Sequence, residues 1–166
     1  MEEKIQEYVT GQKGTLGIDC SGLVYYVLNE ATNGAVKTYF EETLDNEHLE
    51  YKDGILATNL ANAAYGTKIT QAKNIKPGCT IRTSNGGHVL VVHSVNKNAA
   101  GEVTSIVYAH SNDDEGPHHG YITIGDETKD LDDASQTWSD MAYSNPNYLQ
   151  TIYNYTVLLE PVQEFV

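Results

Sequence analysis

Cys20, His88 and His110 could form a catalytic thiol–imidazole pair with a second histidine that orients the first. Cys20 opens an apolar helical pattern, and the unpaired N–H groups at a helix start favour a thiolate. His88 follows two glycines and opens an apolar strand pattern, and His110 ends a later one. This is the general arrangement of nucleophile and base in thiol catalysis. The alternatives are a buried structural cysteine and a structural strand histidine.

The spacing of the two histidines predicts how they meet. If strands 88–95 and 103–110 form a hairpin with its tip at Ala99, His88 and His110 are equidistant from the tip. They then lie directly opposite on one face of the sheet, with Cβ atoms roughly 5 Å apart. His110 can hold one imidazole nitrogen of His88 while the other nitrogen meets the thiol. Alternation puts a further set on this face, namely Leu90, Val92, Ile106 and Tyr108, and puts His93 on the opposite one.

The elements that must position these residues form an α+β pattern of helices followed by strands. Cys20, Leu23, Val24, Val27 and Leu28 mark one face of a helix over 20–28, which ends at Asn33-Gly34. Weaker helical patterns cover 38–45 and 55–64. Short segments rich in Val, Ile, Thr and Tyr predict strands at 79–82, 88–95, 103–110, 121–124 and 151–159. The polar region 126–147 is expected to be a long loop with a helical turn at 132–138.

Length and charge limit the class of protein. The 166 residues predict one domain, 1–166, and 10 basic against 23 acidic residues give a formal net charge of −13. Such a charge repels phosphate, which argues against nucleic acid or an anionic membrane as a partner. No apolar stretch approaches the roughly 20 residues that cross a bilayer, and the first residues lack the blocks of a signal peptide. Two cysteines, Cys20 and Cys79, allow one disulfide but no disulfide framework.

Several segments together resemble the NlpC-type cell-wall cysteine peptidases, papain-like enzymes that cut peptide bonds in bacterial peptidoglycan stems. The segments are Asp19-Cys20-Ser21-Gly22-Leu23-Val24, Gly87-His88-Val89 and a histidine two strands along, His110. Tyr8-Val9-Thr10-Gly11 stands where the family has an aromatic-and-glycine motif, and Ile75-Lys76-Pro77-Gly78 resembles the turn that enters its strands. The resemblance extends over residues 8–110. Cys79 stands where the family has an acidic residue, and Gln12 where it has a glycine.

The resemblance implies a papain-like α+β fold, with N-terminal helices packed on a mainly antiparallel sheet and the catalytic cysteine at a helix N-terminus. It implies Cys20 as nucleophile, His88 as general base and then acid, and His110 as the orienting residue. Three residues would contact the substrate, namely Tyr8, Asp19 and Ser21, and a helix cap is the alternative for Asp19. The implied partner is a peptidoglycan peptide or other small peptide, without a cofactor. The implied location is secreted or at the cell envelope, with the cytoplasm left open because no signal peptide is visible.

Three other functions stay open. His118 and His119 could bind a metal with His110 or Asp113, as in a metal-dependent hydrolase, although we expect 118–119 to be an exposed loop. His88 and His93 cannot share an ion, because residues five apart in a strand face opposite ways. A papain-like domain that binds wall peptide or a protein without cutting is the second alternative. Acyl transfer through the same thioester is the third. Trp138 is expected to be a packing residue, and Cys79 to be buried and inert.

Overall fold

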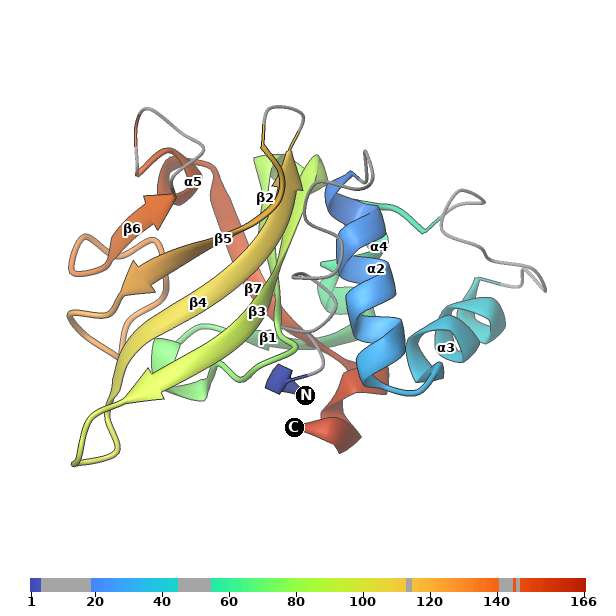
Figure 1. Ribbon diagram of the computed structural model, residues 1–166, viewed down its shortest axis with the longest axis horizontal. Helices are drawn as coiled ribbons and strands as arrows, with labels where there is room; N and C mark the ends of the chain where they lie inside the picture. The colour runs from blue at the N-terminus through green and yellow to red at the C-terminus, as the bar shows by residue number, and fades with distance from the viewer. Residues whose placement is uncertain (4–18, 45–54, 113–114, 141–144, 146) are drawn as a thin grey trace.

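The protein is an α+β structure built on one seven-stranded antiparallel sheet (Figure 1). The computed structural model describes residues 1–3, 19–44, 55–112, 115–140, 145 and 147–166. The strands follow the order β1-β7-β2-β3-β4-β5-β6, with all neighbours antiparallel. Helices α2 and α3 lie on one side of this sheet, and β6 forms the edge that is far from them (Figure 1). Among the described residues, no helix is long and apolar enough to span a bilayer.

The helical part begins with α2 (Cys20–Ala31), as its apolar spacing predicts. Asp19 caps this helix, accepting the Gly22 N–H at 2.7 Å. The helix ends at Asn33 and Gly34, which take positive φ of 53° and 91° and turn the chain into the next helix. The remaining helical segments are α3 (Ala35–Thr43), α4 (Ala57–Leu60), η2 (Ala63–Tyr65), η3 (Ala72–Asn74), η4 (Ser84–Gly86), α5 (Tyr148–Thr151) and η5 (Glu160–Phe165).

The sheet has three long central strands and shorter ones toward its edges. Its members are β1 (Gly66–Ile69), β2 (Thr80–Thr83), β3 (His88–Lys97), β4 (Val103–Asn112), β5 (Gly116–Thr123), β6 (Thr137–Asp140) and β7 (Tyr153–Leu159). All five predicted strands are present with shifted bounds. The sequence patterns did not predict β1 or β6.

The two faces of the sheet bury separate apolar cores. On the helix face, α2, α3 and α4 pack against Val89, Val91 and Ala109. On the other face, the core contains the set predicted to share a side, Leu90, Val92, Ile106 and Tyr108. The alternation predicted for the central hairpin is therefore confirmed for its buried side chains.

The expected loop at 126–147 is confirmed for residues 126–136, which form turns, and is wrong for residues 137–140, which form β6. Residues 126–136 turn back on themselves because the buried Gln136 amide accepts the Gly125 N–H at 3.0 Å and donates to the Asp126 carbonyl at 2.7 Å. The chain then forms β6, in place of the expected helical turn, and pairs with β5. Trp138 is buried, as expected, and its Nε1 donates to the Leu131 carbonyl at 2.8 Å. The predicted loop residues 141–144 and 146 lie outside the described residues.

The register of the β3–β4 hairpin also differs from the prediction. Val91 pairs with Ala109, whereas a tip at Ala99 would pair it with residue 107. The strands are shifted by two residues near the histidines, and bulges interrupt the ladder nearer the turn. A shift of two keeps every side chain on its face. His88 and His110 therefore share a face, but they lie diagonally and not directly opposite.

Candidate functional site

Cys20 is the first residue of α2 and lies at the start of β3. The thiol is partly buried, and it packs on the helix-face core. The backbone N–H of Val89, the residue after His88, is close enough to favour the thiolate, as are those of Ser21 and of Cys20 itself. The paired part of the β3–β4 ladder begins at Val91, two residues further on. The fold therefore brings the start of the helix near the start of the strand. Cys20 packs on the helix-face core, whereas His88 by alternation shares a face with Leu90 and Val92 of the other core.

The acidity of the thiol differs from the expectation for a helix start. Burial raises the pKa of Cys20 above its ordinary value, and the Asp19 carboxylate adds to this effect. The backbone N–H groups at the helix start lower the pKa, but they do not compensate for burial. The resting side chain at neutral pH is therefore a thiol, and the predicted thiolate is wrong for the resting state.

The two predicted histidines are in direct contact. His88 Nε2 and His110 Nδ1 are 2.9 Å apart, and the ring centroids are separated by 5.0 Å at an interplanar angle of 78°. Burial and, to a smaller extent, the neighbouring His110 lower the pKa of His88 to about 3, while Asp140 opposes the shift. Burial also lowers the pKa of His110, which is fully buried. Both rings are therefore neutral near pH 7.

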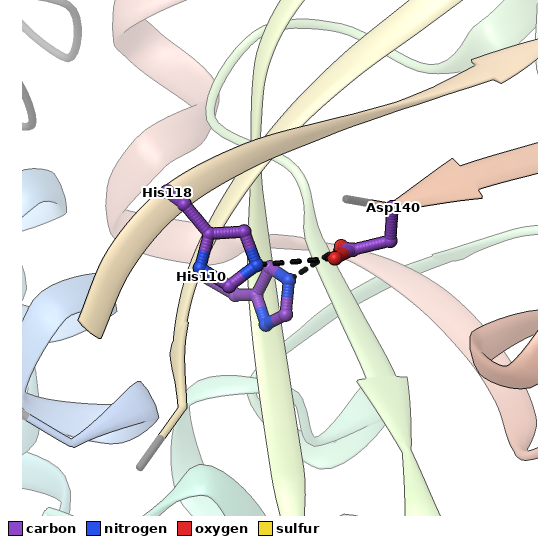
Figure 2. A group of neighbouring side chains, drawn as sticks. All are labelled: His110, His118 and Asp140. Carbon is purple, nitrogen blue, oxygen red and sulfur yellow. Dashed lines mark hydrogen bonds and ion pairs between the residues drawn. The ribbon is translucent and has the colours of Figure 1, made fainter. Parts of the chain in front are cut away.

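The hydrogen-bonded chain continues from His110 to Asp140 and His118, and the sequence patterns did not predict these three residues together. His110 Nε2 is 2.7 Å from Asp140 Oδ2, and His118 Nε2 is 3.1 Å from Asp140 Oδ1, as Figure 2 shows. The Asp140 carboxyl group is fully buried. His110 and His118 are cross-strand partners on β4 and β5, and Asp140 ends β6. The cluster thus takes one residue from each of four consecutive strands.

Gly120 makes room for a third side chain, Tyr108, to contact Asp140. Tyr108, Gly120 and Asp140 form a row across β4, β5 and β6. A Cβ at Gly120 would collide with the Tyr108 ring and hydroxyl. The glycine therefore lets the Tyr108 hydroxyl cross β5 and donate to Asp140 Oδ2 at 3.0 Å. The carboxyl group is held from three directions.

His118 differs from the other two imidazoles in its charge. Its Nδ1 is 2.8 Å from the Gly116 carbonyl oxygen, and its Nε2 faces the Asp140 carboxyl group. Burial disfavours the charged ring, but the contacts with Asp140 and Gly116 outweigh burial and raise the pKa of His118. Both nitrogens face acceptors, so both carry hydrogen, and His118 forms an ion pair with Asp140.

His110, His118 and Asp140 also offer the kinds of ligand atom that zinc binds. One ligand atom from each residue lies within 4.8 Å of the other two. Ligand atoms around tetrahedral zinc lie roughly 3.3 Å apart. His110 Nε2 and Asp140 Oδ2 are closer, at 2.7 Å, which is the length of a charge-assisted hydrogen bond. The ring centroids of His110 and His118 are 4.1 Å apart and the ring planes are tilted by 58°, so the two rings are in direct contact with each other. The geometry fits a hydrogen-bonded cluster better than a coordination sphere.

The remaining candidates have separate places. Tyr8 lies outside the described residues. Asp19 is exposed and acts as the helix cap, and the buried Ser21 hydroxyl donates to it at 3.1 Å. His93 lies apart from the His88–His110 pair, with its ring centroid 5.1 Å from that of His119.

The expected exposed loop at 118–119 is wrong, because both residues belong to β5 and are partly buried. His118 joins His110 in the cluster, whereas His119 is beside His93; Asp113 lies outside the described residues. Asp140 was missed because its strand is only four residues long and ends a polar region. The Thr-Trp-Ser-Asp alternation was the available signal for this strand.

Cys79 is fully buried, as expected. Burial raises the pKa of its thiol to about 11. Both cysteines are free, so the single disulfide that their number allowed is not formed.

Comparisons of the chain with protein-family models, with curated proteins and with solved structures returned no match. The functional argument therefore depends on the geometry of these side chains and on the motif resemblance.

Proposed function

We propose that this protein is a papain-like cysteine peptidase or amidase that hydrolyses amide bonds in bacterial peptidoglycan stem peptides. The observation that carries the proposal is the junction of α2 and β3. A partly buried thiol at a helix start lies beside the first residues of a strand whose histidine is hydrogen-bonded to a second histidine. The substrate class comes from the resemblance of the Cys20 and His88 segments to the NlpC-type peptidases. It implies a location at the cell envelope, where stem peptides occur.

The mechanism begins from a neutral thiol and a neutral imidazole. As the Cys20 sulfur attacks the substrate carbonyl carbon, the thiol proton passes to His88. The imidazolium then gives this proton to the leaving amine, the carbon–nitrogen bond breaks, and a thioester remains. Water, activated by His88, attacks the thioester and releases the carboxylic acid and the thiol. The low pKa of His88 favours the transfer of its proton to the amine, whereas the transfer of the thiol proton to His88 is the costly step.

The surroundings of the thiol supply two further parts. The Cys20 backbone N–H is at the start of α2, where N–H groups lack helical partners and can stabilise the oxyanion. Asp19 is exposed beside the thiol, and its carboxylate could attract the free amine of a stem peptide.

The test is digestion of purified peptidoglycan fragments, with products identified by mass. We expect the wild-type protein to cut a peptide bond in the presence of a strong chelator. Cys20→Ser should abolish cutting, because a hydroxyl is a much weaker nucleophile, and Cys79→Ala is the matched thiol control. His110→Ala should lower kcat by roughly 100-fold or more, and His93→Ala should change it little.

Two results would reject this mechanism. Activity that disappears with chelator and survives in Cys20→Ser would identify a metal-dependent hydrolase. Tight binding of wall fragments without cutting would identify a non-catalytic binding module.

A further inference from the structure

The hydrogen-bonded chain from Asp140 to His88 determines where each proton is placed. A carboxylate can only accept hydrogen bonds, so His110 Nε2 carries the hydrogen in its 2.7 Å contact with Asp140. A neutral His110 then has a lone pair at Nδ1. His88 Nε2, 2.9 Å away, must donate to that lone pair. A neutral His88 is left with its lone pair at Nδ1, the nitrogen that does not face His110.

We propose that Asp140 is a positioning residue that sets the tautomer of His88 through His110, and so leaves Nδ1 of His88 as the base that accepts the thiol proton. This role depends on the proposed function, because it assigns a purpose to the same imidazole. Asp140 does not contact the reacting atoms, because His110 and His88 lie between them. It acts by fixing which nitrogen of His88 is basic.

The orientation of the carboxyl group is fixed by its other partners. Tyr108 donates to Oδ2, and the doubly protonated His118 donates to Oδ1. His118 is in turn held by the Gly116 carbonyl oxygen. Its positive charge compensates the buried carboxylate, which would otherwise be costly at this depth. Asp140 therefore presents one oxygen to His110 and cannot rotate without losing a charged partner.

The variant Asp140→Ala should release the chain. The carboxylate that accepts the His110 Nε2 hydrogen is then absent. His110 is no longer held with its hydrogen at Nε2, and it can carry this hydrogen at Nδ1 and donate to His88 Nε2. His88 is then protonated at Nδ1 in part of the molecules, and its lone pair is divided between its two ring nitrogens.

The direct test is the tautomer of His88, measured by two-bond proton–nitrogen correlation spectra of ¹⁵N-histidine-labelled protein near pH 7. We expect the Nε2–H tautomer alone in the wild type and in Cys20→Ser, and a mixture of the Nε2–H and Nδ1–H tautomers in Asp140→Ala. Tyr108→Phe is the matched control, because it removes a hydrogen bond to the same carboxylate without changing which group His110 faces. An Nδ1–H tautomer in the wild type, or an unchanged tautomer in a folded Asp140→Ala, would overturn the proposal. The wild-type spectrum decides even if the variant does not fold.

Turnover supplies the second readout. Asp140→Ala should lower kcat on the order of 100-fold or more, with KM changed less than about threefold, whereas Tyr108→Phe, which leaves the carboxylate facing His110, should lower kcat less than about tenfold. Equal losses in the two variants would indicate a merely structural role and overturn the assignment. If the wild type cuts no substrate, the proposed function fails, and the tautomer spectra still decide the role of Asp140.

Zinc chloride added at one equivalent distinguishes this arrangement from a metal site. We expect the His110 and His118 signals to be unchanged. Loss of both N–H signals at that stoichiometry would show that the cluster is a coordination sphere, and would also overturn the proposal.

Discussion

Cys20 and Cys79 show at the residue scale how burial decides the reactivity of a thiol. Both thiols have raised pKa values, and burial is the largest cause in each. Cys20 retains exposure and nearby N–H groups, whereas Cys79 is fully buried and its sulfur accepts the Lys76 N–H at 3.4 Å. A helix start therefore does not by itself produce a thiolate, and the proposed reaction would have to remove the proton on Cys20.

The rate of alkylation by iodoacetamide should reflect this difference. We expect Cys20 to react faster than Cys79 at every pH. Because the pKa of Cys20 is raised above 9.0, its rate should increase about tenfold for each pH unit between 7 and 9, in proportion to the thiolate. Peptide mapping by mass after timed labelling measures both rates. A rate for Cys20 that is already constant near pH 7 would instead show a preformed thiolate–imidazolium pair.

At the scale of elements, the central hairpin and the last strands show what sequence patterns predict and what they do not. The helix at Cys20 follows from the helical spacing of its apolar residues. The face that each hairpin side chain occupies follows from the alternation along a strand. The register does not, because it depends on bulges and on the turn, where Asn98 Oδ1 accepts the N–H groups of Ala100 and Glu102. The contact between His88 and His110 was predicted correctly in kind, since a shift of two residues keeps the face.

Asp140 could not be predicted as a partner of His110, because its position depends on contacts between residues that are far apart in the sequence. The segment before β6 is polar, and its ordered shape comes from one side chain, Gln136, that binds backbone groups several residues away. No local period encodes such a contact. The candidate thiol and its two histidines were therefore available from sequence, and the carboxylate that completes the cluster was not.

The Gln136 amide gives a stability prediction for this element. Gln136→Ala leaves the Gly125 N–H and the Asp126 carbonyl without their partner. We expect the free energy of unfolding to fall by about 2–3 kcal/mol, the usual cost of buried polar groups left unpaired. Gln163→Ala is the control, because its hydrogen bond to Thr67 is exposed. Urea unfolding measures both variants, and equal small losses would show that Gln136 does not hold the segment.

At the scale of the whole molecule, the buried neutral histidines make stability depend on pH. His88 has a pKa of about 3 in the folded protein and an ordinary value of 6.5. Between these values the unfolded chain binds a proton that the folded protein does not. Stability from this source is therefore complete above pH 6.5 and is lost as the pH falls toward 3.

Comparison of the wild type with His88→Gln isolates this effect from the titration of carboxylates. Between pH 6.5 and 4.5, the wild type should lose about 2 kcal/mol more of its free energy of unfolding than the variant does. Urea unfolding at a series of pH values is the measurement. Parallel curves for the two proteins would show that His88 is protonated in the folded state.

The edge strand β6 has a consequence for how the protein could be observed while it folds. It carries both Asp140 and the single tryptophan of the chain, Trp138, whose ring centroid lies 5.6 Å from that of Tyr108. Docking of this strand moves the indole from water into the core at the same moment that the carboxylate reaches His110. Intrinsic fluorescence followed after rapid dilution from denaturant would therefore time the assembly of the histidine cluster directly, without substrate and without a label.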